Sequence, residues 1–319
     1  MEFIKLGKIF TPQNHNLFTK LGDFAQSPQA LVMKDRVRVF FSTREKEREG
    51  MFVSYPCYVD FDHSFSHIKG ISQKPLIPTG ERGTFDEHGI FPISPLRVGK
   101  KLFAYTTGWT RRKSVATDSG IGLAISDDGG ENFMKHGKGP VMGASVYEPF
   151  LVSDGFVLLN DNVFHMWYIF GQRWIKNEKE GKPERVYKIA HAVSLDGIEW
   201  KRSGGTVIEN TLGNNECQAL PCVLKYNDIF VLVYCYRHAT DFRNNPHRGY
   251  RLGCAISTDL KNWSSEEMKL IDMIEEDDWD AGMQCYPNIF HLNGEIYLLY
   301  NGNQFGKFGF GIARLSQNN

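Results

Sequence analysis

The sequence lacks the features that mark several common classes of protein. Lys plus Arg and Asp plus Glu both number 37, so no surplus of positive charge indicates a nucleic-acid or membrane surface. No apolar segment approaches the length needed to cross a bilayer. The first residues lack the basic and then apolar pattern of a secretion signal. We therefore expect a cytoplasmic protein that binds neither nucleic acid nor membrane. The sequence does not indicate whether the protein is a monomer or an oligomer.

The cysteines are few and have no metal-binding spacing. Most of the six fall within apolar runs that read as strands: Cys57, Cys217, Cys222, Cys235, Cys254 and Cys285. Buried free thiols in a reducing compartment explain such positions better than disulfides do. Cys217 and Cys222 have no further His or Cys at zinc-finger spacing. The sequence predicts no metal site, and nothing in it indicates a cofactor.

No long helical period is present, and a short phrase recurs instead. Its form is Ala-x-Ser-x-Asp-Gly with a following aromatic residue, and its Ser residues are Ser126, Ser194, Ser257 and, in a degenerate copy, Ser316. The steps between them are 68, 63 and 59 residues, so five units of about 64 residues account for the chain. Repeats of this length built from strands predict a β-propeller.

Each unit also carries an apolar run opened by a proline and followed by an aromatic strand. The five prolines are Pro28, Pro92, Pro149, Pro221 and Pro287. Aromatic and β-branched residues predominate in these runs, so each unit is predicted to be an antiparallel sheet of three or four strands. We expect an all-β, five-bladed propeller that forms one domain over residues 1–319. The amino-terminal strand Phe3–Leu6 is predicted to complete the last blade and close the ring.

The repeated Ser-Asp-Gly phrase is interpreted as structural. Asp and Gly suit a tight turn, the Ser and Asp side chains can accept hydrogen bonds from nearby backbone amides, and the aromatic residue can pack back on its sheet.

The segments just before the five prolines are predicted to line the central channel, and they carry acids and amides. These segments are residues 23–27, 87–91, 144–148, 216–220 and 282–286. Positions are counted back from each proline. Asp23, Glu87 and Glu216 occupy the fifth position before their prolines. Gln218 and Gln284 occupy the third position, and Glu148 occupies the first. Odd positions face one way on an extended strand, so these groups are expected on one surface. The alternative is that the acids cap loops or pair with arginines.

A second group of residues is cationic. The stretch 236–250 contains Arg237, His238, Arg243, His247 and Arg248, and corresponding positions of other repeats hold Arg44, Arg111, Arg112 and Arg173. Arginine binds oxyanions bidentately, which favours an anion site, whereas a solvated loop is the alternative. Trp109, Trp174 and Tyr286 could stack on a sugar ring or pack in the core.

Several phrases look like those of a known superfamily. They are Thr84–Pro92, Tyr147-Glu148-Pro149, Trp279-Asp280 ahead of Tyr286-Pro287-Asn288, and Tyr300–Asn303. In them the chain resembles the five-bladed propeller glycosidases, which include glycoside hydrolase family 43, the invertase and levansucrase group, and the mannoside phosphorylases. The resemblance implies an acid directly before the first proline, where this chain has Gln26-Ser27-Pro28. It also implies a third-blade carboxylate at Glu148 and a fourth-blade acid at Glu216.

These observations together predict a carbohydrate-active enzyme that cleaves or transfers a glycosyl unit at the channel mouth, on a small carbohydrate that is anionic or nucleotide-linked. Glu148 and Glu216 are the predicted acid–base pair, with Glu87 beside them. The predicted substrate-binding residues are Gln26, Arg44, Asp86, His88, Trp109, Arg173, Gln218, Arg237, His238, Gln284 and Tyr286. Two alternatives stay open. One is a glycoside phosphorylase, which the resemblance implies would use one acid and a basic phosphate site. The other is a propeller that binds a sugar without catalysis.

Overall fold

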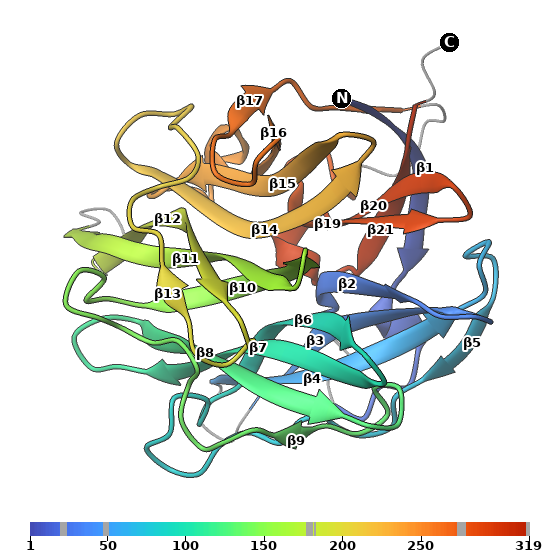
Figure 1. Cartoon of the computed structure of the whole chain (residues 1–319), viewed down its shortest axis with the longest axis horizontal. Coiled ribbons are helices and arrows are strands. Elements are labelled where there is room, and N and C mark those ends of the chain that lie inside the picture. Colours follow the sequence, from blue (N-terminus) through green and yellow to red (C-terminus); the bar gives the residue numbers. More distant parts are fainter. Residues whose placement is uncertain (20–23, 47–50, 177–180, 182, 273–278, 317–319) are drawn as a thin grey trace.

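Five β-sheets are arranged in a ring (Figure 1). The computed structural model describes residues 1–19, 24–46, 51–176, 181, 183–272 and 279–316. Apart from strands and loops, the described residues form three short 3₁₀ turns: η1 (Pro12–Asn14), η2 (Pro246–Arg248) and η3 (Asn303–Gly306). No helix in this part of the chain is long and apolar enough to cross a membrane.

Four of the sheets consist of four consecutive strands. Blade one contains β2 (Gln26–Val32), β3 (Val37–Lys46), β4 (Phe52–Phe61) and β5 (Ile68–Ile71); blade two contains β6 (Ile90–Val98), β7 (Lys101–Arg111), β8 (Thr117–Ser126) and β9 (Met134–Lys135). Blade three contains β10 (Val152–Asn160), β11 (Val163–Lys176), β12 (Pro183–Ser194) and β13 (Lys201–Arg202); blade four contains β14 (Glu216–Tyr226), β15 (Ile229–His238), β16 (Arg251–Ser257) and β17 (Ser264–Glu266). Neighbouring strands within these blades pair antiparallel.

The fifth sheet joins the two ends of the chain. It contains β19 (Cys285–Leu292), β20 (Glu295–Asn301) and β21 (Phe310–Leu315), followed by β1 (Glu2–Phe10) and β18 (Lys269–Ile271). Strand β1 pairs antiparallel with β21 and parallel with β18. The prediction that the amino-terminal strand closes the ring is therefore confirmed, as is the five-bladed fold.

The core lies between the blades. The innermost strands contact one another in the order β2, β6, β10, β14 and β19, and β19 contacts β2 again. In β15, Val231, Leu232, Val233 and Cys235 are fully buried, because both faces of the blade pack on a neighbour. A continuous run of buried apolar residues, rather than simple alternation, is what a strand covered on both faces requires. All six cysteines are buried and free.

The repeated turns have the structural role that the sequence predicted. Ser126 Oγ accepts hydrogen bonds from the backbone N–H groups of Asp128 and Gly130, at 3.3 and 2.9 Å. The Asp128 carboxylate accepts from the N–H groups of Glu131 and Asn132, both at 3.0 Å. The turns at Ser194 and Ser257 repeat these contacts. Desolvation is the largest single influence on the pKa of Asp128 and would raise it, but the hydrogen bonds together outweigh it and lower that pKa to about 2.

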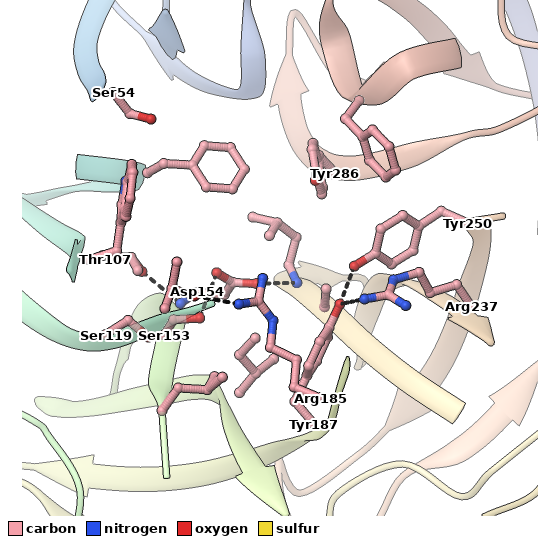
Figure 2. Close-up of a pocket in the computed structure, with 18 of the residues that line it drawn as sticks. Ser54, Thr107, Ser119, Ser153, Asp154, Arg185, Tyr187, Arg237, Tyr250 and Tyr286 are labelled. Atoms are coloured by element: carbon pink, nitrogen blue, oxygen red, sulfur yellow. Dashed lines mark hydrogen bonds between the residues drawn. The ribbon is translucent and has the colours of Figure 1, made fainter. Parts of the chain in front are cut away.

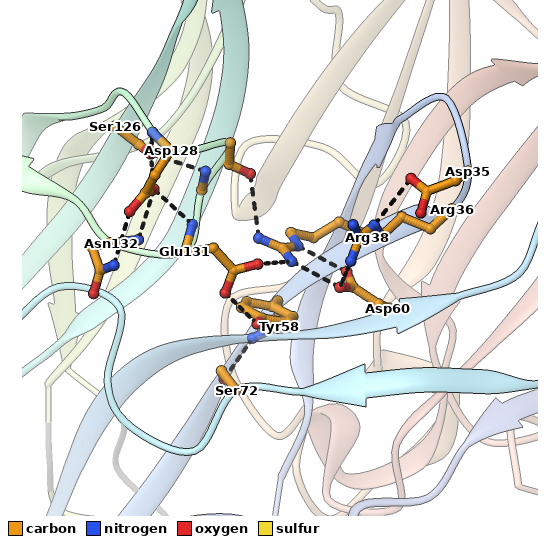
Figure 3. Close-up of polar contacts among 12 residues, drawn as sticks. Asp35, Arg36, Arg38, Tyr58, Asp60, Ser72, Ser126, Asp128, Glu131 and Asn132 are labelled. Carbon is orange, nitrogen blue, oxygen red and sulfur yellow. Dashed lines mark hydrogen bonds and ion pairs between the residues drawn. The ribbon is translucent and has the colours of Figure 1, made fainter.

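The Ser126 turn also connects blade two to blade one (Figure 3). The guanidinium group of Arg38 donates to both carboxylate oxygens of Asp60, at 2.8 and 2.7 Å, and to Glu131 Oε1 at 2.5 Å. It lies 3.6 Å from the ring centroid of Tyr58, whose hydroxyl donates to Glu131 Oε2 at 2.6 Å. Arg38 is 1% exposed and Glu131 is 46% exposed, so this network links two neighbouring blades from a buried arginine to a surface carboxylate.

A bulge interrupts each innermost strand at the same point of the register. The bulges fall at Ser27-Pro28, Phe91-Pro92, Asp154-Gly155, Leu220-Pro221 and Tyr286-Pro287. Gly155, not Pro149, is therefore the third-blade equivalent of the prolines, and the sequence register predicted for that blade is wrong. The predicted channel segments are also displaced, because residues 144–148 precede β10, and β2, β6 and β19 begin at Gln26, Ile90 and Cys285.

Candidate functional site

A cavity of about 290 Å³ occupies the centre of the ring, lined by residues from all five blades (Figure 2). Four of the five bulge residues line it: Phe91, Asp154, Leu220 and Tyr286. Asp154, Leu220 and Tyr286 have positive φ angles of 56°, 48° and 57°, which non-glycine residues rarely adopt. A bulge redirects a side chain out of the regular alternation of a strand. The repeated distortion thus directs one residue from each of these blades at the channel.

Asp154 is the one carboxyl group among the described residues that line this cavity. Its Oδ1 accepts a hydrogen bond from Ser153 Oγ at 3.0 Å, and its Oδ2 accepts from the backbone N–H of Leu220 at 3.3 Å. Its own N–H donates to Thr107 Oγ1 at 2.7 Å. Burial raises the pKa of Asp154 to about 6, although the two hydrogen bonds and the charge of Arg185 oppose the shift. A buried carboxyl group with such a pKa can donate a proton near neutral pH.

Arg237 lies on the opposite side of the cavity with two tyrosines (Figure 2). Its Nη2 donates to the Tyr187 hydroxyl at 2.9 Å, and that hydroxyl lies 2.5 Å from the hydroxyl of Tyr250. The guanidinium carbon lies 3.4 Å from the ring centroid of Phe242. Its Nε is buried and has no hydrogen-bond partner. One donor of a fully desolvated cation is thus left for a ligand.

Two further arginines, Arg185 and Arg44, line the cavity without a salt bridge, although the charge of Arg185 acts on the Asp154 carboxyl group. Arg185 Nη1 donates to Thr117 Oγ1 at 2.5 Å. Arg44 is held by cation–π contacts to Phe24 and Phe52, and its buried Nε has no partner. Within the described part of the chain, neither they nor Arg237 form a salt bridge. Buried charge is costly without a counter-ion, so the cavity is suited to an anionic ligand.

Four of the predicted site residues meet in this cavity, and the others lie elsewhere. Those brought together are Arg44, Trp109, Arg237 and Tyr286. Residues outside its lining are Gln26, Asp86, Glu87, His88, Glu148, Arg173, Glu216, Gln218, His238 and Gln284. Asp23 lies outside the described residues.

Glu148 forms contacts within the protein and does not reach the cavity lining. Its Oε1 accepts a hydrogen bond from the Tyr168 hydroxyl at 2.8 Å. Arg202 Nε lies 2.8 Å from Oε2, an ion pair without good hydrogen-bond geometry at that nitrogen. The side chain is 7% exposed. Its contacts are those of a structural link between the loop before β10 and strand β11.

Glu216 is fully buried at the start of β14, with its oxygens satisfied. One oxygen accepts from the N–H groups of Thr211 and Leu212, at 2.7 and 2.6 Å. The other accepts from Gln218 Nε2 at 2.8 Å and lies 4.0 Å from Lys188 Nζ. These contacts fix the preceding loop, and Glu216 does not line the cavity. Glu148 and Glu216 therefore do not flank a common space, contrary to the geometry that an acid–base pair needs.

Several of the remaining predicted residues also have partners in the fold. His88 stacks near Trp109 with centroids 6.1 Å apart, Glu87 accepts from the N–H of Gly83, and Asp86 pairs with Lys135. Arg173 donates to Asn214 and Asn215, and Gln26 Nε2 donates to the carbonyl of Phe305. Desolvation lowers the pKa of His238. Gln284 is half-buried.

Asp154 is the functional candidate that sequence reasoning missed. The signal was present, because Asp154 interrupts the apolar run Leu151-Val152-Ser153-Asp154-Gly155-Phe156-Val157 of an innermost strand. Burying a charged residue in an apolar run costs free energy, so its presence there indicates a specific role. Alignment on Pro149 placed that residue in the wrong register. Elsewhere in the described chain, no three His, Cys, Asp or Glu side chains gather as a metal site would require.

Comparisons with known proteins give relatives in sequence and in structure. No protein-family profile matches the chain. It is 29% identical over 320 residues to an uncharacterized protein of Mycobacterium tuberculosis strain CDC 1551 / Oshkosh, and equally identical to one of strain ATCC 25618 / H37Rv. Each match covers 99% of both chains.

Several solved structures share the whole fold. A glycoside hydrolase superposes with a TM-score of 0.73 at 16% identity, covering 98% of this chain and 92% of that one. A thermostable family-43 glycoside hydrolase gives 0.64 at 14% identity, covering 92% and 90%. A member of the GH130 family of mannoside phosphorylases, which contains glycoside hydrolases targeting β-1,2 mannosidic linkages, gives 0.68 at 12% identity, covering 98% and 93%. At these identities the likeness concerns the fold alone: this chain is a five-bladed β-propeller that shares its fold with these proteins.

Proposed function

We propose that this protein acts on a carbohydrate in the central cavity and cleaves or transfers a glycosyl unit, with Asp154 as the proton donor. The observation that carries the proposal is the position of Asp154, a buried carboxyl group with a pKa raised to about 6 that opens on the cavity. A general acid at a glycosidic bond needs this combination of protonation and access.

The other walls suit a sugar. Trp109, Tyr187, Tyr250 and Tyr286 contribute aromatic rings, and Thr107, Ser119 and Ser54 contribute hydroxyl groups. Aromatic faces combined with a few hydroxyl groups are typical of small-molecule sites that recognise both the apolar and the polar surfaces of a ligand. The Ser54 Oγ is buried and has no partner in the fold, so it can bond a substrate hydroxyl.

The substrate is proposed to carry an anionic group. Four arginines and one carboxyl group line the cavity, and of the four only Arg243 forms a salt bridge among the described residues, with Glu184 outside the lining. A carboxylate or phosphate on the sugar would accept a hydrogen bond from the unpaired Nε–H of Arg237. Its negative charge would also compensate the excess positive charge of the cavity.

The proposed chemistry has one protein acid. Asp154 transfers its proton to the glycosidic oxygen as the bond from that oxygen to the anomeric carbon breaks, and the electron pair of that bond leaves with the oxygen. No second carboxyl group lines the cavity among the described residues. The anomeric carbon is therefore attacked by an oxygen of the acceptor rather than by a protein carboxylate. That acceptor is water in hydrolysis or an alcohol in transfer. It loses its proton to solvent as the new bond to the anomeric carbon forms, and solvent returns a proton to Asp154.

Phosphorolysis is a second candidate, favoured by the same single carboxyl group and unpaired arginines. Inorganic phosphate would then be the attacking acceptor and would be bound by the arginines. A structural neighbour belongs to a family of mannoside phosphorylases, which makes this reaction a natural alternative on this fold.

The test measures release of 4-nitrophenol from 4-nitrophenyl hexosides, pentosides and uronides, with and without added phosphate. We expect turnover of an anionic glycoside by the wild type and its loss in Asp154→Asn. The matched control is Asp161→Asn, because Asp161 is exposed, lies in the same blade and also has a positive φ, of 48°. Turnover that requires phosphate would establish the second candidate. Full activity of Asp154→Asn would refute the proposal, and tight sugar binding with no product would indicate a binding protein.

A further inference from the structure

A second cavity, of about 450 Å³, adjoins the central one. The two cavities share Arg44 and Trp109 as lining residues. The second cavity is otherwise lined by Met51, Phe52, Arg111, Arg112, Lys113, Ser114, Val115, Ala116 and Pro183. It therefore lies against the β7–β8 hairpin and the start of β4, on the outer side of Arg44.

Arg44 stands at the boundary between the cavities without an ionic partner. Its buried Nε has no hydrogen-bond partner, and its guanidinium carbon lies 5.0 and 5.7 Å from the ring centroids of Phe24 and Phe52. Two aromatic faces position a guanidinium group but cannot accept its N–H groups in the plane. Desolvation lowers the pKa of Arg44, which agrees with a cation that lacks a counter-charge. Its Nε–H thus has no acceptor in the described part of the fold and can donate to a planar or tetrahedral oxyanion.

The rest of the second cavity adds positive charge and apolar surface. Arg111, Arg112 and Lys113 are consecutive, and no acidic residue is among the described residues that line the cavity. Arg112 is paired at its rim with Asp118, at 2.5 Å, while Lys113 is exposed. Met51, Phe52 and Val115 supply apolar contacts beside these cations. Arg111 also donates to the carbonyl of Phe52 at 2.7 Å. The cavity therefore combines an edge of paired and exposed cations with an apolar wall.

We propose that the second cavity binds the leaving group of the substrate and that this group carries a phosphate held by Arg44. The inference rests on the proposed function, because it places the scissile bond between Asp154 in the central cavity and the shared wall formed by Arg44 and Trp109. The substrate class is then a glycoside of a phosphorylated alcohol. A phosphate suits several adjacent cations better than a monoanionic carboxylate does, since it carries more charge and more acceptor oxygens.

Isothermal titration calorimetry at fixed ionic strength tests this assignment. The probes are phenyl phosphate, which has an apolar group beside the phosphate, and inorganic phosphate, which has none. We expect phenyl phosphate to bind the wild type at least tenfold more tightly than inorganic phosphate, and Arg44→Gln to weaken it about tenfold or more, or about 1.4 kcal/mol. Lys113→Ala, at an exposed position that should not affect folding, should weaken it about threefold.

Two controls separate this inference from the proposed function. Arg314→Gln removes an exposed positive charge from β21 and should leave the Kd of phenyl phosphate unchanged. Asp154→Asn should also leave the Kd of phenyl phosphate unchanged, because the probe occupies the outer cavity. The loss of turnover in Asp154→Asn therefore tests the proposed chemistry separately from phosphate binding. Equal affinity of wild type, Arg44→Gln and Lys113→Ala would overturn the assignment. Inorganic phosphate binding as tightly as phenyl phosphate would show that the phosphate is a separate reactant rather than part of the leaving group.

Discussion

The substitution Asp154→Asn should abolish activity and at the same time stabilise the protein in a pH-dependent way. The amide retains an oxygen that can accept from the Leu220 N–H and the Ser153 hydroxyl, but it has no charge to desolvate. General acid catalysis contributes about 10²- to 10⁴-fold to rate, so kcat should fall by that order. A stabilising substitution that removes activity is the signature of a residue kept for function.

The magnitude of the stability change follows from the shift in pKa. Burial raises the pKa of Asp154 from 3.8 to about 6 in the folded protein. Each unit corresponds to about 1.36 kcal/mol, so ionised Asp154 costs the folded state about 3 kcal/mol. The folded state binds the proton more tightly, so this cost is absent below the unfolded pKa, develops as pH rises through the window from 3.8 to about 6, and is complete above it.

Urea unfolding of both proteins above and below this window provides the assay. At a pH well above 6 the Asn variant should be more stable by up to about 3 kcal/mol, and the difference should shrink by about that amount on going below pH 3.8. A difference in unfolding free energy that does not change with pH would refute the reasoning, because Asp154 would then ionise normally. Asp161→Asn should show no such pH dependence.

Four variants or profiles test other parts of the account. The kcat/KM of the wild type should decline as pH rises above about 6, because Asp154 must be protonated; a profile that stays flat well above this pH would contradict this role. Glu148→Gln should lower the unfolding free energy by about 1–3 kcal/mol while kcat of the folded enzyme is unchanged; a collapse of kcat at normal stability would restore Glu148 as catalytic. Arg38→Met should cost about 1–3 kcal/mol in urea unfolding, since the buried Asp60 loses two hydrogen bonds and keeps only Arg36 as a charged partner; a neutral effect would show that the network contributes little. Phe3→Ala, at a fully buried position of the closing strand, should cost about 3–5 kcal/mol; a Tm equal to that of the wild type would mean that β1 closes the ring only weakly.

The contrast between blades shows where sequence reasoning held and where it failed. The Ser126, Ser194 and Ser257 turns were identified correctly, because their bonds join groups only two to four residues apart. The third innermost strand was misplaced, because Pro149 resembles the prolines of the other blades whereas the actual equivalent is Gly155. Either proline or glycine can occupy this position of the bulge. A pattern based on proline therefore cannot locate the bulge in the third blade.

The acids show the same limit. Glu148 and Glu216 were selected because carboxylates in repeated positions attract a catalytic interpretation. The sequence does not reveal the partners of these two acids. Glu148 contacts Arg202 and Tyr168, and Glu216 accepts from the amides of Thr211 and Leu212. Whether a buried acid is satisfied or available depends on donors contributed by other strands and loops.

Periodicity along the chain was enough to establish the number of blades, the strand composition, the turns and the closing strand, because each depends on repeats and on bonds between near neighbours. Which residues face the channel emerges only when the ring closes. The five bulges turn side chains such as Asp154 and Tyr286 inward, and packing around them leaves Arg44 and Arg237 without a carboxylate. Function depends on that convergence of residues from different blades, and convergence is a property of the closed ring rather than of any one repeat.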